Sequence, residues 1–199
     1  MSMTREMRSS TMDLDPAAQP TPEQEKSKEA DNARKFITEP LSPEFLAEHG
    51  ATPFLLITDW TETGENGETK VVYKKFDNGD VQMFLISKAT KDGKRTKDKK
   101  AITEVEYEQL LAASRSHVEK CRHEFTYTQN GTSFAVNYDE FAGGRLYMLD
   151  VDAKTEEGKD SFNLIEFPSK DFPIKLVEVT EDKQYSGHRI FDIVQTIQH

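Results

Sequence analysis

Charged side chains alternate with apolar ones in several segments that otherwise have the composition of β-strands. Lys120 and Arg122 are separated by one residue, and so are Asp150 and Asp152, so each pair lies on one face of an extended strand. Further charged residues stand within or at the ends of predicted strands: Lys35, Lys74, Lys88 and Asp139. For any single pair, the simpler interpretation is a solvent-facing position on a half-buried strand.

As a set, these side chains would form a polar interior if the strands closed into a barrel with the charges facing inward. Guanidinium and ammonium groups contact phosphate oxygens, and carboxylates bind the divalent ions that bridge phosphates. The low dielectric of an enclosed interior would strengthen each of these contacts. The pattern therefore indicates a site for a polyanionic, phosphate-containing ligand.

The elements that must position these residues are mostly strands. Ser42 and Pro43 have the types expected at the start of a helix, and Thr103 with Glu106 forms a capping box before a second helix over 104–115. The segment 185–198 is amphipathic and fits either a helix or a strand. Eight strands are predicted, over 33–39, 53–60, 69–76, 81–88, 123–129, 132–141, 145–153 and 174–180. This pattern predicts an α+β protein in which eight antiparallel strands close into a barrel with a few flanking helices, because closure removes exposed sheet edges.

The remaining segments have the composition of a tail and a loop. Residues 1–31 contain no aromatic residue and are rich in Ser, Thr, Pro, Glu and Lys, which predicts a disordered tail before a single domain over 32–199. The basic run 88–100, with a turn expected at Asp92–Gly93, is interpreted as a solvated hairpin loop; contact with RNA phosphates is the alternative.

Composition restricts the classes of partner. Charged residues make up 31% of the chain and the formal net charge is −10, which argues against nucleic acid or a membrane surface as partner. This net charge is still compatible with a basic pocket inside an acidic shell. Cys121 is the only cysteine, so no intramolecular disulfide can form and a reducing, cytoplasmic location is expected. No apolar run has the length of a signal peptide core or a membrane span, and the oligomeric state is not indicated.

The order of these motifs resembles that of the CYTH domain, the barrel of the triphosphate tunnel metalloenzymes. The K-x-R stretch at Lys120–Arg122 is followed by an Asn130–Gly131 turn, a strand ending in Asp139-Glu-Phe, and a strand with the acidic pair Asp150–Asp152. Three other segments are similar to family motifs: Ala33-Arg-Lys-Phe-Ile, Phe84-Leu-Ile-Ser-Lys88 and Glu178-Val-Thr-Glu-Asp-Lys-Gln-Tyr185. The family includes thiamine triphosphatases, class IV adenylyl cyclases, and inorganic and RNA triphosphatases, which act on triphosphates with a divalent metal inside an eight-stranded tunnel.

The resemblance implies two sets of ligands. Lys35, Lys88, Lys120 and Arg122 would bind phosphate, with Lys74 and Arg95 as further candidates for that role. Asp139, Asp150 and Asp152 would hold Mg²⁺ or Mn²⁺. The resemblance assigns no catalytic residue in this chain.

The chain departs from the family pattern at its carboxylates. Asp31 and Ala33 stand where the opening motif has two glutamates, and Lys97 and Lys99 replace two more. These changes would weaken metal binding and add positive charge. We therefore expect a protein that binds a small-molecule polyphosphate or nucleotide, with weak or lost hydrolysis. Two alternatives stay open, an active metal-dependent triphosphatase and a structural protein that keeps only the barrel. The direction in which Lys97 and Lys99 point bears most on this choice.

Overall fold

Nine antiparallel strands form one sheet in the computed structural model, which describes residues 33–64, 67–91, 94–153, 158, 160–168, 174–185 and 187–198. The strands are β1 (Ala33–Thr38), β2 (Thr52–Gly64), β3 (Gly67–Phe76), β4 (Val81–Lys91), β5 (Lys94–Ala101), β6 (Ser116–Gln129), β7 (Thr132–Phe141), β8 (Leu146–Ala153) and β9 (Leu176–Glu178). The helices are α1 (Pro43–Glu48), α2 (Glu104–Leu111) and α4 (Ile190–Gln198), with 3₁₀ turns η1 (Leu164–Glu166), η2 (Lys183–Tyr185) and η3 (Gly187–Arg189). The predicted tail 1–31 and the Asp92–Gly93 turn lie outside the described residues. The α+β class is confirmed.

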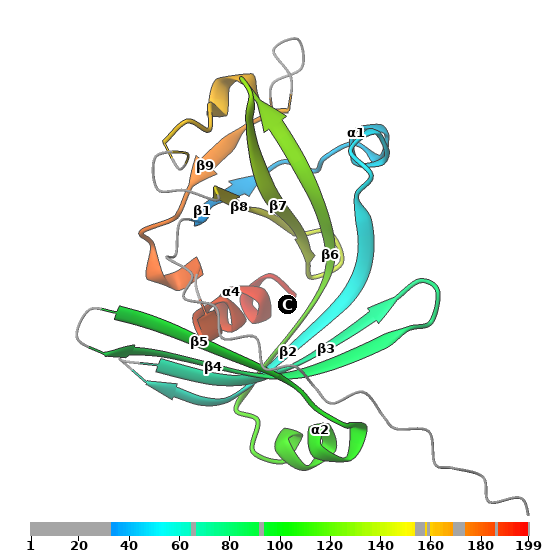
Figure 1. Ribbon diagram of the computed structural model, residues 1–199, viewed down its shortest axis with the longest axis vertical. Helices are drawn as coiled ribbons and strands as arrows, with labels where there is room; N and C mark the ends of the chain where they lie inside the picture. Colours follow the sequence, from blue (N-terminus) through cyan, green and yellow to red (C-terminus); the bar gives the residue numbers. More distant parts are fainter. Residues whose placement is uncertain are drawn as a thin grey trace, which may run out of the picture.

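The sheet contains one strand more than the sequence predicts. Its order is β5-β4-β3-β2-β6-β7-β8-β1-β9, and the unexpected strand is β5, which pairs antiparallel with β4. The interpretation of 88–100 as a solvated loop was therefore wrong for the described part of that run. The sheet is strongly curved (Figure 1), with β5 and β9 at its two edges, and no described pairing joins them. Closure into a barrel stays a prediction.

The two predicted helix starts are confirmed by their hydrogen bonds. Ser42 Oγ accepts a hydrogen bond from the Phe45 amide at 3.1 Å. Thr103 Oγ1 accepts from the Glu106 amide at 3.2 Å, while Glu106 Oε2 accepts from the Thr103 amide at 2.8 Å. These side chains satisfy amide groups that have no partner inside the helix, which fixes where each helix begins. No helix in the described part of the chain has the length and apolarity to cross a membrane.

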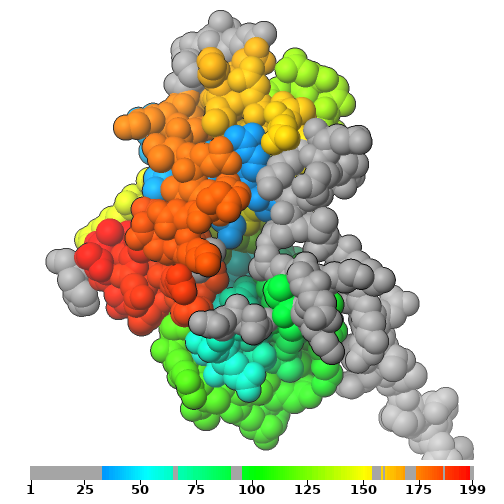
Figure 2. Space-filling model, turned by 90° about the vertical axis from the view of Figure 1, so that its left-hand side faces the viewer, coloured from blue at the N-terminus to red at the C-terminus, as the bar shows by residue number. Residues whose placement is uncertain are grey.

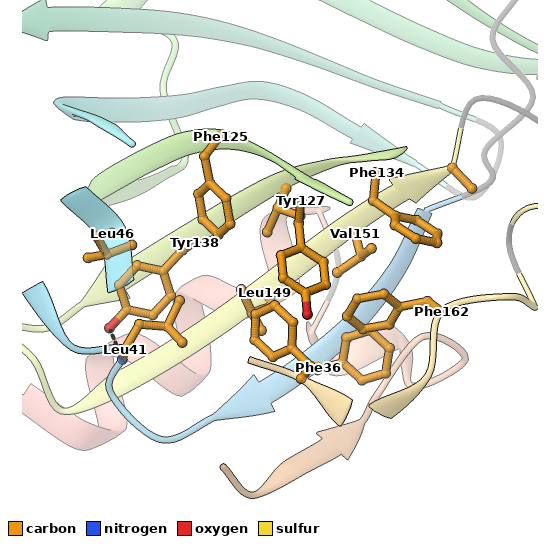
Figure 3. Close-up of a cluster of buried hydrophobic side chains, with 13 residues drawn as sticks. Phe36, Leu41, Leu46, Phe125, Tyr127, Phe134, Tyr138, Leu149, Val151 and Phe162 are labelled. Carbon is orange, nitrogen blue, oxygen red and sulfur yellow. Dashed lines mark hydrogen bonds between the residues drawn. The ribbon is translucent and has the colours of Figure 1, made fainter. Parts of the chain in front are cut away.

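Alternating residues of the sheet bury one large core on the convex face and two smaller apolar clusters on the concave face, the smallest of which is formed by Phe54, Leu56 and Val72. On β7, Phe134, Val136 and Tyr138 point into the larger core (Figure 3), which also holds Phe36 of β1 and Leu149 of β8. The intervening residues of these strands point to the concave face.

The larger of the two clusters on the concave face is completed by α4. Ile190 and Val194 of this helix are buried, and they pack with Trp60, Val118 and other apolar residues of the sheet. The ambiguous segment 185–198 is therefore helical over most of its length. Figure 1 shows α4 inside the curve of the sheet and α2 on the outside, and Figure 2 shows the C-terminal residues in red at the surface of the molecule. One end of the concave face is thus apolar and covered by α4. The charged residues of the same face lie outside this covered end and are the candidates for a binding site.

Candidate anion-binding site

Cations from β4 and β5 meet on the concave face. Lys97 of β5 pairs with Lys88 of β4, and Lys88 pairs with Glu68 of β3. One step along the sheet, Lys99 pairs with Ile86, which pairs with Lys70. Residues directly opposite in a ladder project from the same face, so these six side chains share a side of the sheet.

The exposure of β5 residues shows which way its lysines point. Lys97 and Lys99 are half-buried, whereas Thr96, Asp98 and Lys100 are exposed. Lys99 also lies over the ring of Phe84, with its Nζ 4.0 Å from the ring centroid. Lys97 and Lys99 therefore face the concave side of the sheet. The resemblance to the CYTH pattern had left this direction open.

Glu68 is the centre of one polar cluster on this face. Its Oε2 accepts a hydrogen bond from Trp60 Nε1 at 3.0 Å, and its Oε1 lies 3.5 Å from Lys70 Nζ and 3.7 Å from Lys88 Nζ. Burial alone would raise the pKa of Glu68, but the two lysines outweigh burial and lower it. Burial also lowers the pKa of Lys70, to about 8, in spite of the attraction of Glu68. Neither Glu68 nor Lys70 was among the predicted site residues.

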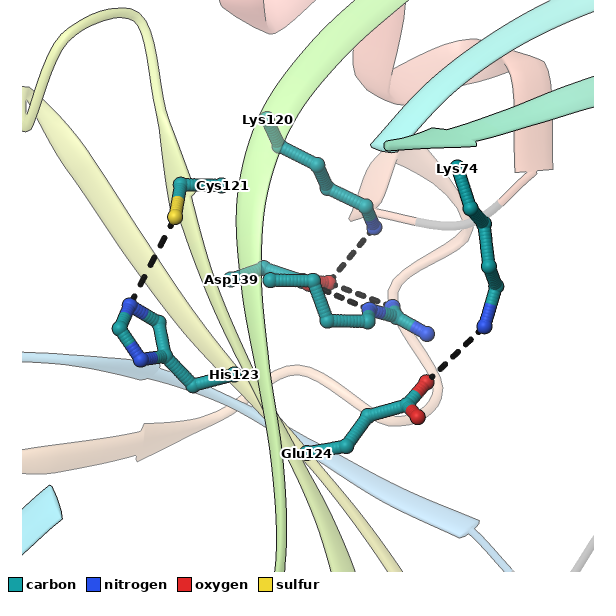
Figure 4. A network of polar contacts seen from close by, with 7 residues as sticks. Lys74, Lys120, Cys121, His123, Glu124 and Asp139 are labelled. Atoms are coloured by element: carbon teal, nitrogen blue, oxygen red, sulfur yellow. Dashed lines mark hydrogen bonds and ion pairs between the residues drawn. The ribbon is translucent and has the colours of Figure 1, made fainter. Parts of the chain in front are cut away.

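Asp139 is the centre of a second cluster (Figure 4). Its Oδ2 accepts hydrogen bonds from Lys120 Nζ at 2.6 Å and from an Arg122 terminal nitrogen at 2.7 Å, while Oδ1 accepts from Arg122 Nε at 2.6 Å. The carboxylate is 5% exposed. Burial would raise the pKa of Asp139, but Arg122 and Lys120 lower it to about 2. Both oxygens of the predicted metal ligand are therefore engaged by the two predicted phosphate ligands.

The two clusters are electrostatically coupled. Burial lowers the pKa of Lys120 to about 8, and the positive charge of Arg122 contributes to this shift. The charge of Lys120 in turn helps to lower the pKa of Lys70, which belongs to the Glu68 cluster. Lys74, whose Nζ lies 3.4 Å from Glu124 Oε1, has a pKa lowered by burial and by the charges of Arg122 and Lys99. Cations of β3, β5 and β6 thus lie close enough to repel one another.

The predicted acidic pair lies farther along the same face. Asp150 is opposite Lys35, and Asp152 is opposite Ala33. The charge of Asp150 raises the pKa of Arg122, which places this carboxylate near the Asp139 cluster. Among the described residues, no group of three or more His, Cys, Asp or Glu side chains is arranged to hold a metal ion. The concave face carries all the predicted site residues except Arg95, whose side chain lies outside the described part: Lys35, Lys74, Lys88, Lys120, Arg122, Asp139, Asp150 and Asp152.

Two other polar features lie away from this face. Cys121 and His123 point to the opposite side of β6 (Figure 4), with Cys121 Sγ 3.6 Å from His123 Nε2. Burial raises the pKa of the Cys121 thiol, as does the charge of Glu140, so the sulfur is poorly suited to act as a nucleophile. A cavity of about 840 Å³ lies beside β9, where Arg34 and Glu178 form a two-pronged ion pair. Its charged groups are largely acidic, so it does not share the cationic character of the concave face.

Comparison with solved structures agrees with this architecture. The chain matches the crystal structure of the inorganic triphosphatase NE1496 with a TM-score of 0.51 and 20% identity, over 80% of this chain and 92% of that chain. This chain has the fold of an inorganic triphosphatase. A second structure of NE1496 matches with the same TM-score and identity and is covered over 95% of its length. The resemblance to the CYTH domain is thereby confirmed for the fold. No protein-family model and no curated protein sequence matches this chain.

Proposed function

We propose that the concave face of this triphosphatase fold binds a polyphosphate-containing anion, inorganic or nucleotide, and that metal-dependent hydrolysis is weak or lost. One observation carries the proposal: Lys97 and Lys99 face the concave side beside Lys88 and Lys70. Ammonium groups at these positions offer direct contacts to phosphate oxygens, whereas carboxylates there would have offered contacts to a metal.

The charge balance of this face supports an anionic ligand. Among the residues of this face whose side chains the structure describes, eight are cations and five are carboxylates, although the chain as a whole has a net charge of −10. The cations are Lys35, Lys70, Lys74, Lys88, Lys97, Lys99, Lys120 and Arg122; the carboxylates are Glu68, Glu124, Asp139, Asp150 and Asp152. A concave surface with this excess of positive charge concentrates field lines and attracts anions.

The distribution of the cations favours a chain of phosphates over a single phosphate. Cations are present on β5, β4, β3 and β6, and β2 lies between the last two. Neighbouring strands are about 4.8 Å apart, so these five strands span roughly 19 Å along the sheet. One phosphate cannot contact cations spread over that arc, whereas a triphosphate or a longer chain can contact several of them together.

The residues present are a poor fit to a catalytic divalent metal. Glu68 and Asp139 are each held by two cationic side chains. A metal that stabilises the charge developing during phosphoryl transfer needs oxygen ligands that are not already neutralised. Asp150 and Asp152 are the other two predicted metal ligands, and they lie on a face with an excess of positive charge. This composition supports binding with little turnover.

Titration with inorganic tripolyphosphate tests the proposal directly. Trp60 is the only tryptophan, is 4% exposed, and contacts both Glu68 and Lys70, so its fluorescence reports on the site alongside calorimetry. We expect saturable binding of tripolyphosphate and ATP that weakens with salt, and much weaker binding of orthophosphate.

Matched variants distinguish the concave face from general surface charge. Lys88→Gln with Lys99→Gln should lower the affinity for tripolyphosphate by more than about tenfold, because two contacts are lost. Lys75→Gln with Lys100→Gln removes the same charge from exposed positions on the other face and should leave the affinity nearly unchanged. No binding at millimolar tripolyphosphate would contradict the proposal and favour a purely structural protein.

A further inference from the structure

Two carboxylates of the concave face, Glu68 and Asp139, are each held by two cations of the same chain. Glu68 is bonded to Trp60 and lies between Lys70 and Lys88. Asp139 accepts three hydrogen bonds from Lys120 and Arg122 and is almost completely buried. To bind a metal ion, either carboxylate would have to release its ammonium or guanidinium partners and leave them buried without a counter-ion, which is costly.

None of the residues directly opposed to the acidic pair on β8 is a carboxylate. Asp150 lies between Lys35 on β1 and Asn137 on β7, and Asp152 lies between Ala33 and Ala135. Opposed residues on adjoining strands are the side chains that approach most closely within a sheet. The directly opposed residues therefore supply one cation, one amide and two methyl groups. The carboxylate diagonal to Asp150 is Asp139, which is already held by Lys120 and Arg122, and among the described residues no group of three such ligands is arranged for a metal ion.

We infer that the ligand of this site is the metal-free polyphosphate anion, and that Mg²⁺ competes with the protein for the ligand. This inference rests on the proposed function. Lysine and arginine side chains take the place of the ion in neutralising the phosphates and contact the same oxygens. When Mg²⁺ is bound to the polyphosphate, it blocks some of those oxygens and removes two negative charges from the ligand. The cation-rich face then binds the Mg²⁺ complex more weakly than the free anion.

Titration with and without Mg²⁺ tests this inference on the intact protein. Sodium tripolyphosphate is titrated in EDTA and again in excess Mg²⁺, with NaCl added so that the ionic strength is equal in both. We expect binding in EDTA and an apparent Kd raised by about tenfold in Mg²⁺, the change that corresponds to the loss of about two ion-pair contacts. Trp60 fluorescence and calorimetry are read in parallel.

A pair of variants tests the role of the lysines on β5. Lys97→Glu with Lys99→Glu, combined with Ala33→Glu beside Asp152, should weaken binding in EDTA and make the remaining binding stronger in Mg²⁺ than in EDTA. Lys75→Glu with Lys100→Glu makes the same change of lysine to glutamate on the other face and should keep the wild-type response. Thermal unfolding of each variant shows whether it folds, and the wild-type titration stands on its own if one does not.

The possible outcomes separate this inference from the proposed function. Binding in EDTA that Mg²⁺ weakens at constant ionic strength supports both. Binding that requires Mg²⁺, or is strengthened by it, overturns the inference and leaves anion binding intact. Binding that is equal in the two buffers also overturns the inference, because competition for the ligand is then absent. No binding in either buffer overturns the proposed function itself.

Discussion

Lys88 and Lys97 are directly opposed in the β4–β5 ladder although both are positively charged. Like charges at directly opposed positions destabilise a sheet. Lys88 is partly compensated by Glu68 on its other side, 3.7 Å away. Repulsion between the two ammonium groups disfavours this pairing, and an anion bound beside them would offset the repulsion. We therefore expect removal of one of these charges to lower anion affinity without lowering stability.

Lys97→Gln should separate these two effects. In the absence of ligand we expect the melting temperature to stay the same or rise by about 1–3 °C, because one repulsive charge is lost. The affinity for tripolyphosphate should fall severalfold in the same variant. Differential scanning calorimetry with and without tripolyphosphate measures both. Lys75→Gln, on the outer face, is the control and should change neither quantity. A clear loss of stability in Lys97→Gln without ligand would show that the repulsion between Lys88 and Lys97 does not destabilise the sheet.

Binding should depend on pH through Lys70 and Lys120. Burial lowers the pKa of each lysine to about 8, so both begin to lose their charge as the pH rises through that value. Because the anion favours the charged forms, binding should take up protons near pH 8 and weaken between pH 7 and 9.5. Calorimetry in buffers of different ionisation enthalpy measures this uptake.

Lys70→Arg provides the control for that pH profile. Arginine keeps its charge over the whole range, so the variant should lose less affinity between pH 7 and 9.5 than the wild type. The protonation of tripolyphosphate also changes with pH, but it changes equally in both experiments and so cancels when the two proteins are compared. Identical profiles would mean that Lys70 does not contribute through its charge.

Asp139 should make stability sensitive to acid. Its pKa of about 2 is below the ordinary value of 3.8, so the native state holds the carboxylate charged where the unfolded chain begins to bind a proton. The resulting stabilisation is complete above about pH 4 and is lost as the pH falls through 2, with a size of about 2 kcal/mol. Urea unfolding at pH 4.5 and 2.5 measures it.

Asp139→Asn isolates this contribution. The variant lacks the ionisable group, so its stability should fall less between pH 4.5 and 2.5 than that of the wild type. At neutral pH it should be less stable by about 3 kcal/mol, because Lys120 and Arg122 lose their buried counter-ion. An equal acid response in the two proteins would assign the sensitivity to other carboxylates.

Turnover should be slow even with added metal. We expect phosphate release from tripolyphosphate or ATP, with Mg²⁺ or Mn²⁺, well below about 1 s⁻¹. Ala33→Glu with Lys97→Glu and Lys99→Glu should raise metal affinity and increase this rate. If the native protein turns over at 1 s⁻¹ or faster and Asp150→Ala removes the activity, then the surviving aspartates are sufficient for a functional metal site.

The sequence predicted the elements whose signals are local. The caps at Ser42 and Thr103 and the Asn130–Gly131 turn depend on neighbouring residues, and they are present as expected. β5 was missed because KRTKDKKA has a single apolar residue, so it shows no hydrophobic alternation. In β5 it is the exposure of polar side chains that alternates. Lys97 and Lys99 point to the concave face, and the residues next to them point to solvent.

The candidate site was predicted in part for a related reason. Lys120, Arg122 and Asp139 stand out because charged residues interrupt apolar strands, and the structure brings them into direct contact. Glu68 was missed because it lies just before the strand predicted over 69–76, in a segment with the composition of a polar loop. Lys70 lies within that predicted strand but was not among the predicted site residues, because no motif marked it. That Asp139 would be held by two cations depends on the pairing of β6 with β7, which no local pattern specifies.

The position of α4 has a consequence for how the chain acquires its site during synthesis. All nine strands precede α4 along the chain, so they leave the ribosome before the helix that covers Trp60 and Val118 is made. Until Ile190 and Val194 arrive, the apolar end of the concave face is open to water and to other nascent chains. The sheet can pair its neighbouring strands early, but the apolar end of the concave face is covered only when the helix docks. A chaperone that shields this apolar patch would therefore act between the emergence of β9 and that of α4.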